Sequence, residues 1–241
     1  MKIGTLYGIG VGPGDPELIT LKGVRLLRQC PHVFVPKART ATDSVALSIA
    51  RRYLSSSSQV HELIFPMSSD QADLARHWMV SAGEIAAVLK GGEDACFLTL
   101  GDPLLYSTYI YLLRELKNLW PEARVVTVPG VTAFSAAAAL AGFPVGEKKE
   151  TVTIIPTADD LEDVRRVLSG GGTVILMKVG RRLREILNVL EEAKVIDHSV
   201  FVSHAGMENE QVETNLRRLN AEDPQAGYLS IILAHAEEKR S

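Results

Sequence analysis

Short apolar runs alternate with longer helix-period segments along almost all of this chain. The runs are rich in valine and isoleucine and are bounded by glycine, proline or polar clusters, which is typical of buried strands. We expect strands at 3–10, 32–36, 60–65, 95–100, 124–128, 151–156, 173–178, 199–203, 210–214 and 228–234. Helices are expected between them, at 16–29, 43–54, 70–90, 104–118, 132–140, 159–168 and 181–193. This alternation predicts an α/β fold with mostly parallel strands and helices on the faces of the sheet.

Ten strands are too many for one open sheet in 241 residues. Two α/β domains fit better, each with a roughly five-stranded mixed sheet flanked by helices. The pattern is interrupted at Trp120-Pro121, which predicts an N-terminal domain over 1–120 and a C-terminal domain over 121–241.

Several helix ends carry clear signals. Asp15 is expected to cap the first helix and Asp70 the helix over 70–90, since aspartate accepts hydrogen bonds from the free N–H groups there. Gly91-Gly92 is expected to end the second of these helices.

Composition narrows the class of protein. A net charge of −3 with 23% charged residues argues against disorder and against a general affinity for nucleic acid. Cys30 and Cys96 are far apart among apolar residues, so we expect two buried thiols, and no spacing predicts a metal site. With neither a signal-peptide pattern nor a long apolar run, a cytoplasmic location without membrane contact is expected.

The first strand runs into a glycine-rich turn with Gly8, Gly10, Gly12 and Gly14. The dinucleotide fingerprint G-x-G-x-x-G needs a third glycine where this chain has Pro13, and it needs an acidic residue after the second strand. That strand ends in Pro36-Lys37 instead, which disfavours a nicotinamide oxidoreductase. The P-loop pattern is absent. The crowded glycines indicate either a tight turn or a backbone that a ligand approaches closely.

Two further loops follow predicted strands. Leu100-Gly101-Asp102-Pro103 comes after the fourth strand, where ligands bind in open α/β sheets. Asp102 can accept hydrogen bonds from a ligand, or the segment is simply a turn with a helix cap. The third loop, Val128–Ala133, precedes a segment of small residues over 135–139, which permits close packing against a sheet or a ligand.

In this order, the loops resemble the tetrapyrrole methylase family. The matching segments are Gly10–Gly23, Leu100–Pro103 and Val128–Ala133, and the resemblance spans essentially the whole chain. It implies two α/β domains with an S-adenosylmethionine site in the cleft between them, and a homodimer. It also implies donor contacts from Pro13, Leu100, Gly101, Asp102, Leu105, Thr132, Ala133, Met177 and Gly206.

Within the family, the details resemble enzymes that methylate C-20 of precorrin-2 or its cobalt form in cobalamin biosynthesis. The resemblance is carried by Gly101–Leu112, by Phe34–Lys37 and by the segment over 147–156. Uroporphyrinogen methylases usually carry a Tyr-Asp pair near position 36, where this chain has Pro36. That departure disfavours the uroporphyrinogen assignment.

The resemblance implies that an electron-rich ring carbon attacks the methyl group of the sulfonium donor. Tyr106 is the leading candidate to contact the substrate, expected one helical turn after the Gly-Asp-Pro loop. Lys37 and Arg39 are candidates to pair with its carboxylates. Solvated lysines are expected at Lys148-Lys149, and His204 is expected not to bind metal. The catalytic base is not identified, and any cobalt would enter with the macrocycle.

Three alternatives remain open at the level of sequence. A sibling enzyme would methylate another carbon, of uroporphyrinogen III or of a later precorrin. A non-catalytic nucleotide- or tetrapyrrole-binding protein would bind the donor without turnover. A nicotinamide oxidoreductase would bind NAD but not S-adenosylhomocysteine.

Overall fold

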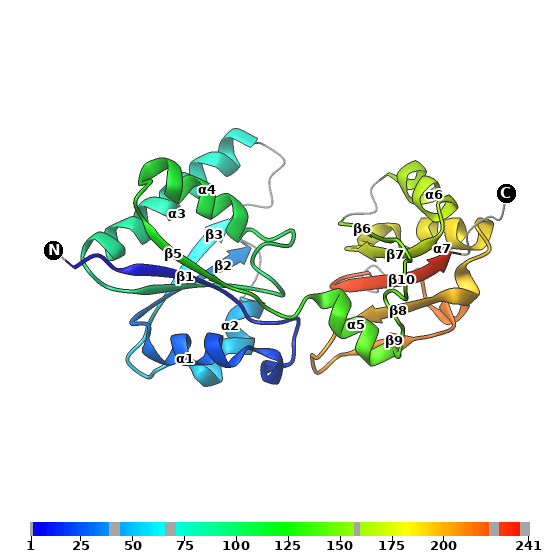
Figure 1. The fold of residues 1–241 in the computed structure, drawn as a ribbon, viewed down its shortest axis with the longest axis horizontal. Helices are drawn as coiled ribbons and strands as arrows, with labels where there is room; N and C mark the ends of the chain where they lie inside the picture. The colour runs from blue at the N-terminus through cyan, green and yellow to red at the C-terminus, as the bar shows by residue number, and fades with distance from the viewer. Residues whose placement is uncertain (1, 39–43, 66–70, 157–159, 222–226, 237–241) are drawn as a thin grey trace. The chain divides into compact units, whose positions relative to one another are not determined.

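The computed structural model describes residues 2–38, 44–65, 71–156, 160–221 and 227–236. The chain divides into two compact units, Met1–Thr132 and Ala133–Ser241 (Figure 1). Each unit contains one five-stranded sheet with helices packed against it, so the predicted two-unit α/β architecture is confirmed. All ten predicted strands are present.

The first sheet is parallel throughout. Its strand order is β3-β2-β4-β1-β5, and each neighbouring pair runs in the same direction. The strands are β1 (Thr5–Gly10), β2 (His32–Ala38), β3 (Gln59–Phe65), β4 (Ala95–Thr99) and β5 (Arg124–Val128).

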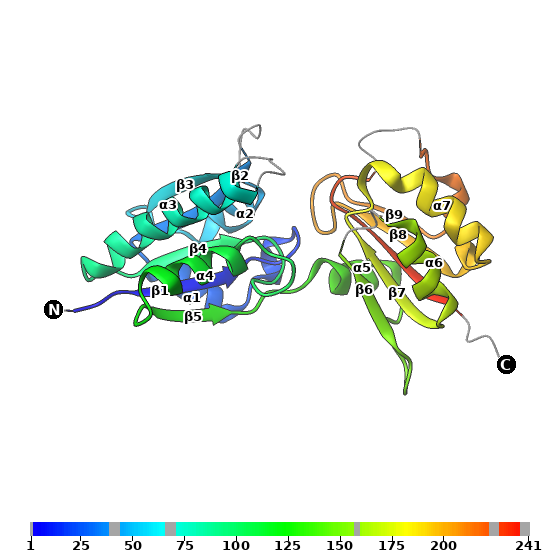
Figure 2. The same cartoon turned by 90° about the horizontal axis from the view of Figure 1, so that it is seen from above.

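Helices cover both faces of the first sheet (Figures 1 and 2), which is why its central strand β4 is apolar on both sides. In β4, Phe97 packs among residues of α3 (Gln71–Lys90) and α4 (Tyr109–Leu119). Cys96 and Leu98 point to the other face, toward α1 (Leu21–Gln29) and α2 (Val45–Ala50).

Both cysteines are free and buried in the core on the α1 side, as predicted. The neighbouring Cys30 thiol and burial raise the pKa of Cys96, so this thiol stays protonated and packs as a small apolar group.

The division between the units lies after Thr132, and the predicted boundary at residue 120 is corrected accordingly. The reason is β5, which follows the Trp120-Pro121 interruption but pairs in parallel with β1, with Ile9 opposite Val128. The interruption is the turn between α4 and β5, not a link between domains.

The second sheet is mixed, with strand order β6-β7-β10-β8-β9. β6 and β7 run parallel, whereas β10 is antiparallel to both β7 and β8, and β9 is antiparallel to β8. The strands are β6 (Val152–Ile155), β7 (Gly172–Met177), β8 (Ser199–Ser203), β9 (Gln211–Glu213) and β10 (Ser230–Ala236).

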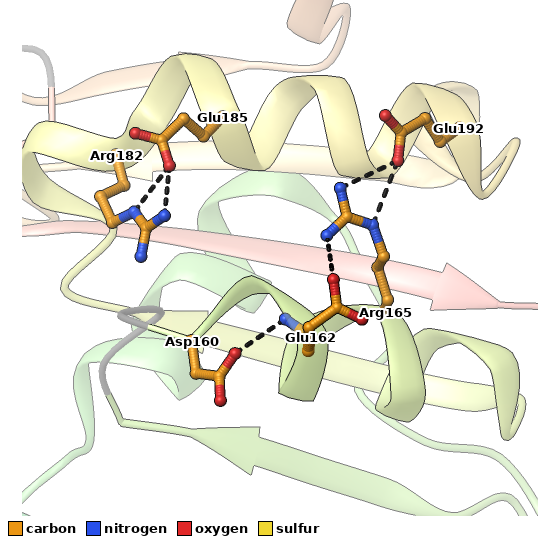
Figure 3. A network of polar contacts seen from close by, with 6 residues as sticks. All are labelled: Asp160, Glu162, Arg165, Arg182, Glu185 and Glu192. Atoms are coloured by element: carbon orange, nitrogen blue, oxygen red, sulfur yellow. Dashed lines mark hydrogen bonds and ion pairs between the residues drawn. The ribbon is translucent and has the colours of Figure 1, made fainter.

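Helices α6 (Leu161–Ser169) and α7 (Leu183–Glu192) share a core with the second sheet. Arg165 links them, because its guanidinium contacts Glu162 at 2.9 Å on its own helix and Glu192 at 3.2 Å on α7 (Figure 3). These pairs are exposed, so each contributes about 0–1 kcal/mol. The short α5 (Ala133–Ala141) packs against β8 and β10, where its small residues Ala136–Ala138 are buried.

Two predicted helices begin differently from expectation. The segment 16–29 divides into a 3₁₀ turn, η1 (Pro16–Leu18), and α1. Asp15 caps the turn through the Glu17 N–H, and Thr20 caps α1 through the Gly23 N–H. The helix expected from residue 104 begins only at Tyr109. The expected cap Asp70 lies outside the described residues, whereas Gly91-Gly92 follows the end of α3 as predicted.

The remaining short helical turns are η2 (Arg51–Tyr53), η3 (Gly180–Arg182), η4 (Ile196–His198) and η5 (Leu216–Arg218). Over the described ranges, no helix has both the length and the apolar character needed to cross a bilayer.

Candidate functional site

The loops that follow β1, β4 and β5 meet at one edge of the first sheet, because these three strands are parallel neighbours. This is the carboxyl edge, where open α/β sheets bind their ligands. The three motifs that the sequence analysis singled out are therefore brought together within the first unit.

Main-chain hydrogen bonds join the first two loops. The Gly101 N–H donates to the Gly12 carbonyl at 2.8 Å, and the Gly12 N–H donates to the Gly101 carbonyl at 3.4 Å. Both glycines have positive φ, +79° for Gly12 and +69° for Gly101, which disfavours any residue with a Cβ. Val11 extends the contact by donating to the Thr99 carbonyl at 3.0 Å.

Glycine is also required where the third loop meets the other two. A Cβ on Gly130 would lie 2.1 Å from the carbonyl oxygen of Gly101, and a Cβ on Gly10 would lie 2.5 Å from the same atom. Neither distance is possible between non-bonded atoms, so the three backbones can approach only because these residues have no side chain. The result is an edge built from closely packed main chain.

Asp102 ties the second loop to the third. One carboxylate oxygen accepts from the Leu104 N–H at 2.9 Å, and the other accepts from the Gly130 N–H at 3.0 Å. The sequence left a ligand contact and a capped turn open for Asp102. The structure shows a turn contact, together with a bond between loops 28 residues apart.

The other predicted donor residues of the first unit lie in the same loops. Pro13 is buried within the glycine turn, and Leu100 is partly buried against the core beneath it. Leu105 is also partly buried, with its N–H 3.5 Å from the Asp102 carbonyl. Thr132 ends this unit and Ala133 begins α5.

Tyr106 lies in this edge, but the expected helical setting is wrong. The residue precedes α4 by three positions and has a φ of +51°, in the left-handed region that non-glycine residues rarely adopt. Its side chain is 45% exposed. Tyr106 is therefore a strained, accessible aromatic residue in the loop that follows Gly101.

Two hydroxyl pairs lie near the start of α4, one of which includes Ser107, the residue after Tyr106, and sequence reasoning missed them. The Thr99 and Ser107 hydroxyl oxygens lie 2.7 Å apart, and Ser107 Oγ also accepts the Tyr109 N–H at 3.1 Å. The Tyr109 hydroxyl lies 3.0 Å from Thr127 Oγ1, and burial raises the pKa of this phenol. Nothing in the sequence pointed to Ser107 or Thr99, because the helix expected over 104–118 placed Ser107 in its interior.

Lys37, a predicted substrate contact, has a charged partner within its own sheet. It lies in β2, and its ammonium group forms an ion pair with Glu62 of β3, with Nζ and Oε2 2.8 Å apart. Its positive charge is thus partly neutralised within the sheet. Arg39, the other predicted carboxylate contact, lies outside the described residues.

In the second unit, Met177 and the loop that holds Gly206 share one edge of the sheet. Met177 lies opposite Ile231, and Ser203 lies opposite Ser230, because β10 is antiparallel to β7 and β8. Gly206 has a φ of +74°, and its N–H donates to Glu210 Oε2 at 2.6 Å.

His204 is fixed at this second edge by its backbone. Its φ is +52°, its N–H donates to the Leu229 carbonyl at 3.0 Å, and its ring lies 5.8 Å from that of Tyr228. Burial lowers the pKa of His204, which favours the neutral ring near pH 7. Within the described part of the chain, no three His, Cys, Asp or Glu side chains are grouped to hold a metal ion.

The second unit also contains a cavity of about 390 Å³ at the opposite edge of its sheet. Lys148 and Lys149 line it, together with Gly170–Gly172 at the start of β7 and His235 near the end of β10. None of the predicted site residues lines this cavity. Within the second unit, the edge that holds Met177 and Gly206 is thus distinct from this cavity.

Comparisons with known proteins give a consistent result. The sequence profile described as Tetrapyrrole (Corrin/Porphyrin) Methylases matches residues 5–220. The chain is 34% identical over 234 residues to the cobalt-precorrin-2 C(20)-methyltransferase of Salmonella typhimurium, with 97% of both chains covered. It is 29% identical over 239 residues to the precorrin-2 C(20)-methyltransferase of a Sinorhizobium species, covering 96% of this chain and 95% of the relative.

A solved structure of a cobalt precorrin-4 methyltransferase has a similar fold. Its TM-score is 0.74 at 22% identity, and the match covers 96% of this chain and 94% of that one. At this identity the likeness concerns the fold alone.

Proposed function

The chain belongs to the tetrapyrrole (corrin/porphyrin) methylase family, and we propose that it methylates C-20 of precorrin-2 or cobalt-precorrin-2. The family and its relatives make it an S-adenosylmethionine-dependent C-methyltransferase of the cobalamin pathway. One observation carries the choice of carbon. Two relatives named for C-20 are 34% and 29% identical over 96–97% of this chain, whereas one named for precorrin-4 C(11) matches only 64% of it and one named for uroporphyrinogen III is 27% identical over 98%.

The carboxyl edge of the first sheet supports a donor site by its rigidity. The loops after β1, β4 and β5 pack main chain against main chain at Gly10, Gly101 and Gly130, which fixes their arrangement before a ligand binds. We propose that Pro13, Leu100, Gly101, Asp102, Leu105 and Thr132 bind the donor from the first unit, and Ala133, Met177 and Gly206 from the second.

S-adenosylmethionine, when bound, supplies a methyl group that its sulfonium centre has already activated. The residues of the chain therefore need to bind, orient and exclude water, which can remove roughly 7–11 kcal/mol from a barrier in ideal cases. Asp102 contributes by locking two loops together through the Leu104 and Gly130 N–H groups. The buried Pro13 contributes a dry, rigid wall to the glycine turn.

For the tetrapyrrole we propose a contact from Tyr106, whose exposed side chain lies in the same edge as Gly101. Lys37 is a weaker candidate than Tyr106, because Glu62 already accepts its charge. Arg39 keeps its place as a proposed partner for a substrate carboxylate. The resemblance to the family also supports a homodimer, which light scattering on the purified protein can test.

Cobalt in the substrate distinguishes the two versions of this proposal. The relative with the higher identity is named for the cobalt form, at 34% against 29%, and we favour cobalt-precorrin-2 on that ground. No protein-bound metal is proposed, since the metal would arrive as part of the substrate.

The test is an anaerobic turnover with S-adenosylmethionine carrying a ¹³C-methyl group, offered with precorrin-2 and cobalt-precorrin-2 in parallel. NMR of the product locates the label. A new methyl at C-20, formed faster from the cobalt substrate, is the expected result. A label at another carbon would contradict the C-20 assignment, and binding of S-adenosylhomocysteine without any turnover would contradict the proposed reaction.

A further inference from the structure

Tyr106 has an unfavourable backbone conformation that its own side chain does not explain. Its φ of +51° lies in the left-handed region, and the residue is 45% exposed, so packing within the chain does little to compensate. Strain of this kind persists only where neighbouring residues impose it, and it is concentrated at functional sites. Neighbouring groups must therefore impose the left-handed backbone of Tyr106.

The residues on both sides of Tyr106 are anchored. Before it, the Leu104 N–H is held by the Asp102 carboxylate. After it, Ser107 is only 6% exposed and its hydroxyl lies 2.7 Å from that of Thr99, the last residue of β4. Between these anchors the chain has little freedom, and Tyr106 is the residue that turns outward.

The anchor after Tyr106 is itself rigid. Ser107 Oγ accepts the Tyr109 N–H, and Tyr109 is fully buried with its ring against Gly8, where a Cβ would lie 2.2 Å from a ring carbon. Thr99 is 4% exposed and belongs to a central strand. The Thr99–Ser107 pair thus connects the rigid sheet to the loop that presents Tyr106.

We propose that the Thr99–Ser107 hydroxyl pair is a positioning element that holds Tyr106 toward the tetrapyrrole. This inference rests on the proposed function, in which Tyr106 contacts that substrate. Thr99 and Ser107 are positioning residues, because both are buried and act through Tyr106. They should therefore affect the affinity for the macrocycle and leave the affinity for the methyl donor unchanged.

Thr99→Val tests the proposal, because it removes the hydroxyl and keeps the branched shape, while Thr99→Ser keeps the hydroxyl. We expect Thr99→Val to raise the KM for the tetrapyrrole about tenfold, as the loss of one buried hydrogen bond predicts. The value of kcat and the Kd for S-adenosylhomocysteine should stay within about twofold, as for loss of uniform substrate binding. Thr99→Ser should restore the KM.

A double-mutant cycle shows whether the effect passes through Tyr106. In a Tyr106→Ala background, Thr99→Val should have no further effect on the tetrapyrrole KM. Ser199→Ala is the matched control: it removes a buried serine hydrogen bond of 2.7 Å at the start of β8, and it should lower stability without changing that KM. If Thr99→Val does not fold, Ser107→Ala replaces it in the same cycle.

The outcomes separate the two proposals. An equal effect of Thr99→Val in both backgrounds, no effect at all, or an equal loss of S-adenosylhomocysteine affinity would overturn the positioning role and leave the methyltransferase assignment intact. A wild-type protein that methylates neither tetrapyrrole would overturn the proposed function, and the positioning role with it.

Discussion

The two sheet edges that carry the candidate residues are built by different means. At the edge of the first sheet, Gly10, Gly101 and Gly130 meet so closely that no side chain fits among them. At the edge of the second sheet, Lys178, His204 and Leu229 adopt positive φ although they carry full side chains. The first edge combines glycines from three loops with one strained side-chain residue, Tyr106. The second edge has a single close glycine contact, in which a Cβ on Gly227 would lie 2.0 Å from the Gly180 carbonyl oxygen, and three strained residues that carry side chains.

This difference has a physical consequence. A left-handed residue with a side chain costs about 1–2 kcal/mol and can be exchanged for another at a similar cost. A glycine in contact with backbone on two sides has no substitute. Substitution should therefore be least tolerated at Gly10, Gly101 and Gly130 and better tolerated at the strained residues of the second edge, such as Lys178. We make four predictions, in order of expected effect.

The largest effect is expected from Gly130→Ala, because the added Cβ would collide with the Gly101 carbonyl oxygen. We expect the free energy of unfolding to fall by at least about 3 kcal/mol. Gly180→Ala in the second unit is the matched control, since its φ is +48° but a Cβ there meets open space, and it should cost only about 1–2 kcal/mol. Urea denaturation of both variants measures the difference, and equal losses would refute the contrast.

Asp102→Ala should have the next largest effect. It leaves the Gly130 and Leu104 N–H groups without their carboxylate partner, and each hydrogen bond to a charged group contributes about 1.5–3 kcal/mol. Asp102→Asn retains one oxygen acceptor and should lose about half as much stability. Denaturation, together with calorimetric titration with S-adenosylhomocysteine, checks this. An Asn variant as unstable as the Ala variant would argue against two separate bonds.

Lys178→Gly should have a small effect of opposite sign. Lys178 is exposed with a φ of +52°, so glycine relieves the strain and removes no buried contact. Subtracting the entropic cost of glycine leaves an expected gain of roughly 0.5 kcal/mol in the free energy of unfolding. A loss of stability in thermal denaturation would mean that the second edge, like the first, depends on its particular residues.

The smallest effect concerns pH. Burial, and then the ring of His32 at 2.9 Å, lower the pKa of His61, while Glu84 acts in the opposite direction. Glu93, 2.9 Å from His32, is the other charged group of this cluster. Because the unfolded state binds the proton more readily, His61 favours folding fully above about pH 6.5, and this contribution is lost as the pH falls through the lowered pKa.

The pH prediction also distinguishes the units. For His204 in the second unit, burial alone lowers the pKa, with no neighbouring histidine. Thermal denaturation at pH 7.5 and pH 5.5 should therefore show a greater reduction of the acid-induced Tm decrease in His61→Gln than in His204→Gln. If His61→Gln and His204→Gln reduced the fall in Tm between pH 7.5 and pH 5.5 equally, the His32–His61 contact would contribute nothing to the pH dependence.

The sequence predicted those parts of the fold and of the candidate site that leave a local pattern of residues. The ten strands were predictable because buried strands such as β4 and β7 are continuous apolar runs between turn residues. The glycine-built edge was predictable because only glycine satisfies it, so Gly10, Gly101 and Gly130 stand out in the sequence. The unit boundary was misplaced because pairing of β5 with β1 is a long-range contact that no local signal reports.

The remaining site features depend on tertiary contacts. Lys37 looked like a free cation in sequence, and only the parallel register of β2 and β3 brings Glu62 to it. Tyr106 was expected in a helix because the following residues have helical periodicity, but α4 begins only at Tyr109, whose N–H donates to Ser107 Oγ. The positive φ of His204 and Leu229 could not be predicted, because glycine is the residue that usually marks this conformation in a sequence.

The most direct test of the central claim is to map S-adenosylhomocysteine binding by NMR on the ¹⁵N-labelled protein. If the glycine-built edge binds the donor, the largest amide shift changes will fall in Leu100–Leu105 and at Gly130, Thr132 and Ala133, with changes at Met177 and Gly206. Shift changes confined to the cavity lined by Lys148, Gly171 and His235, with none at Gly101 or Asp102, would contradict the account.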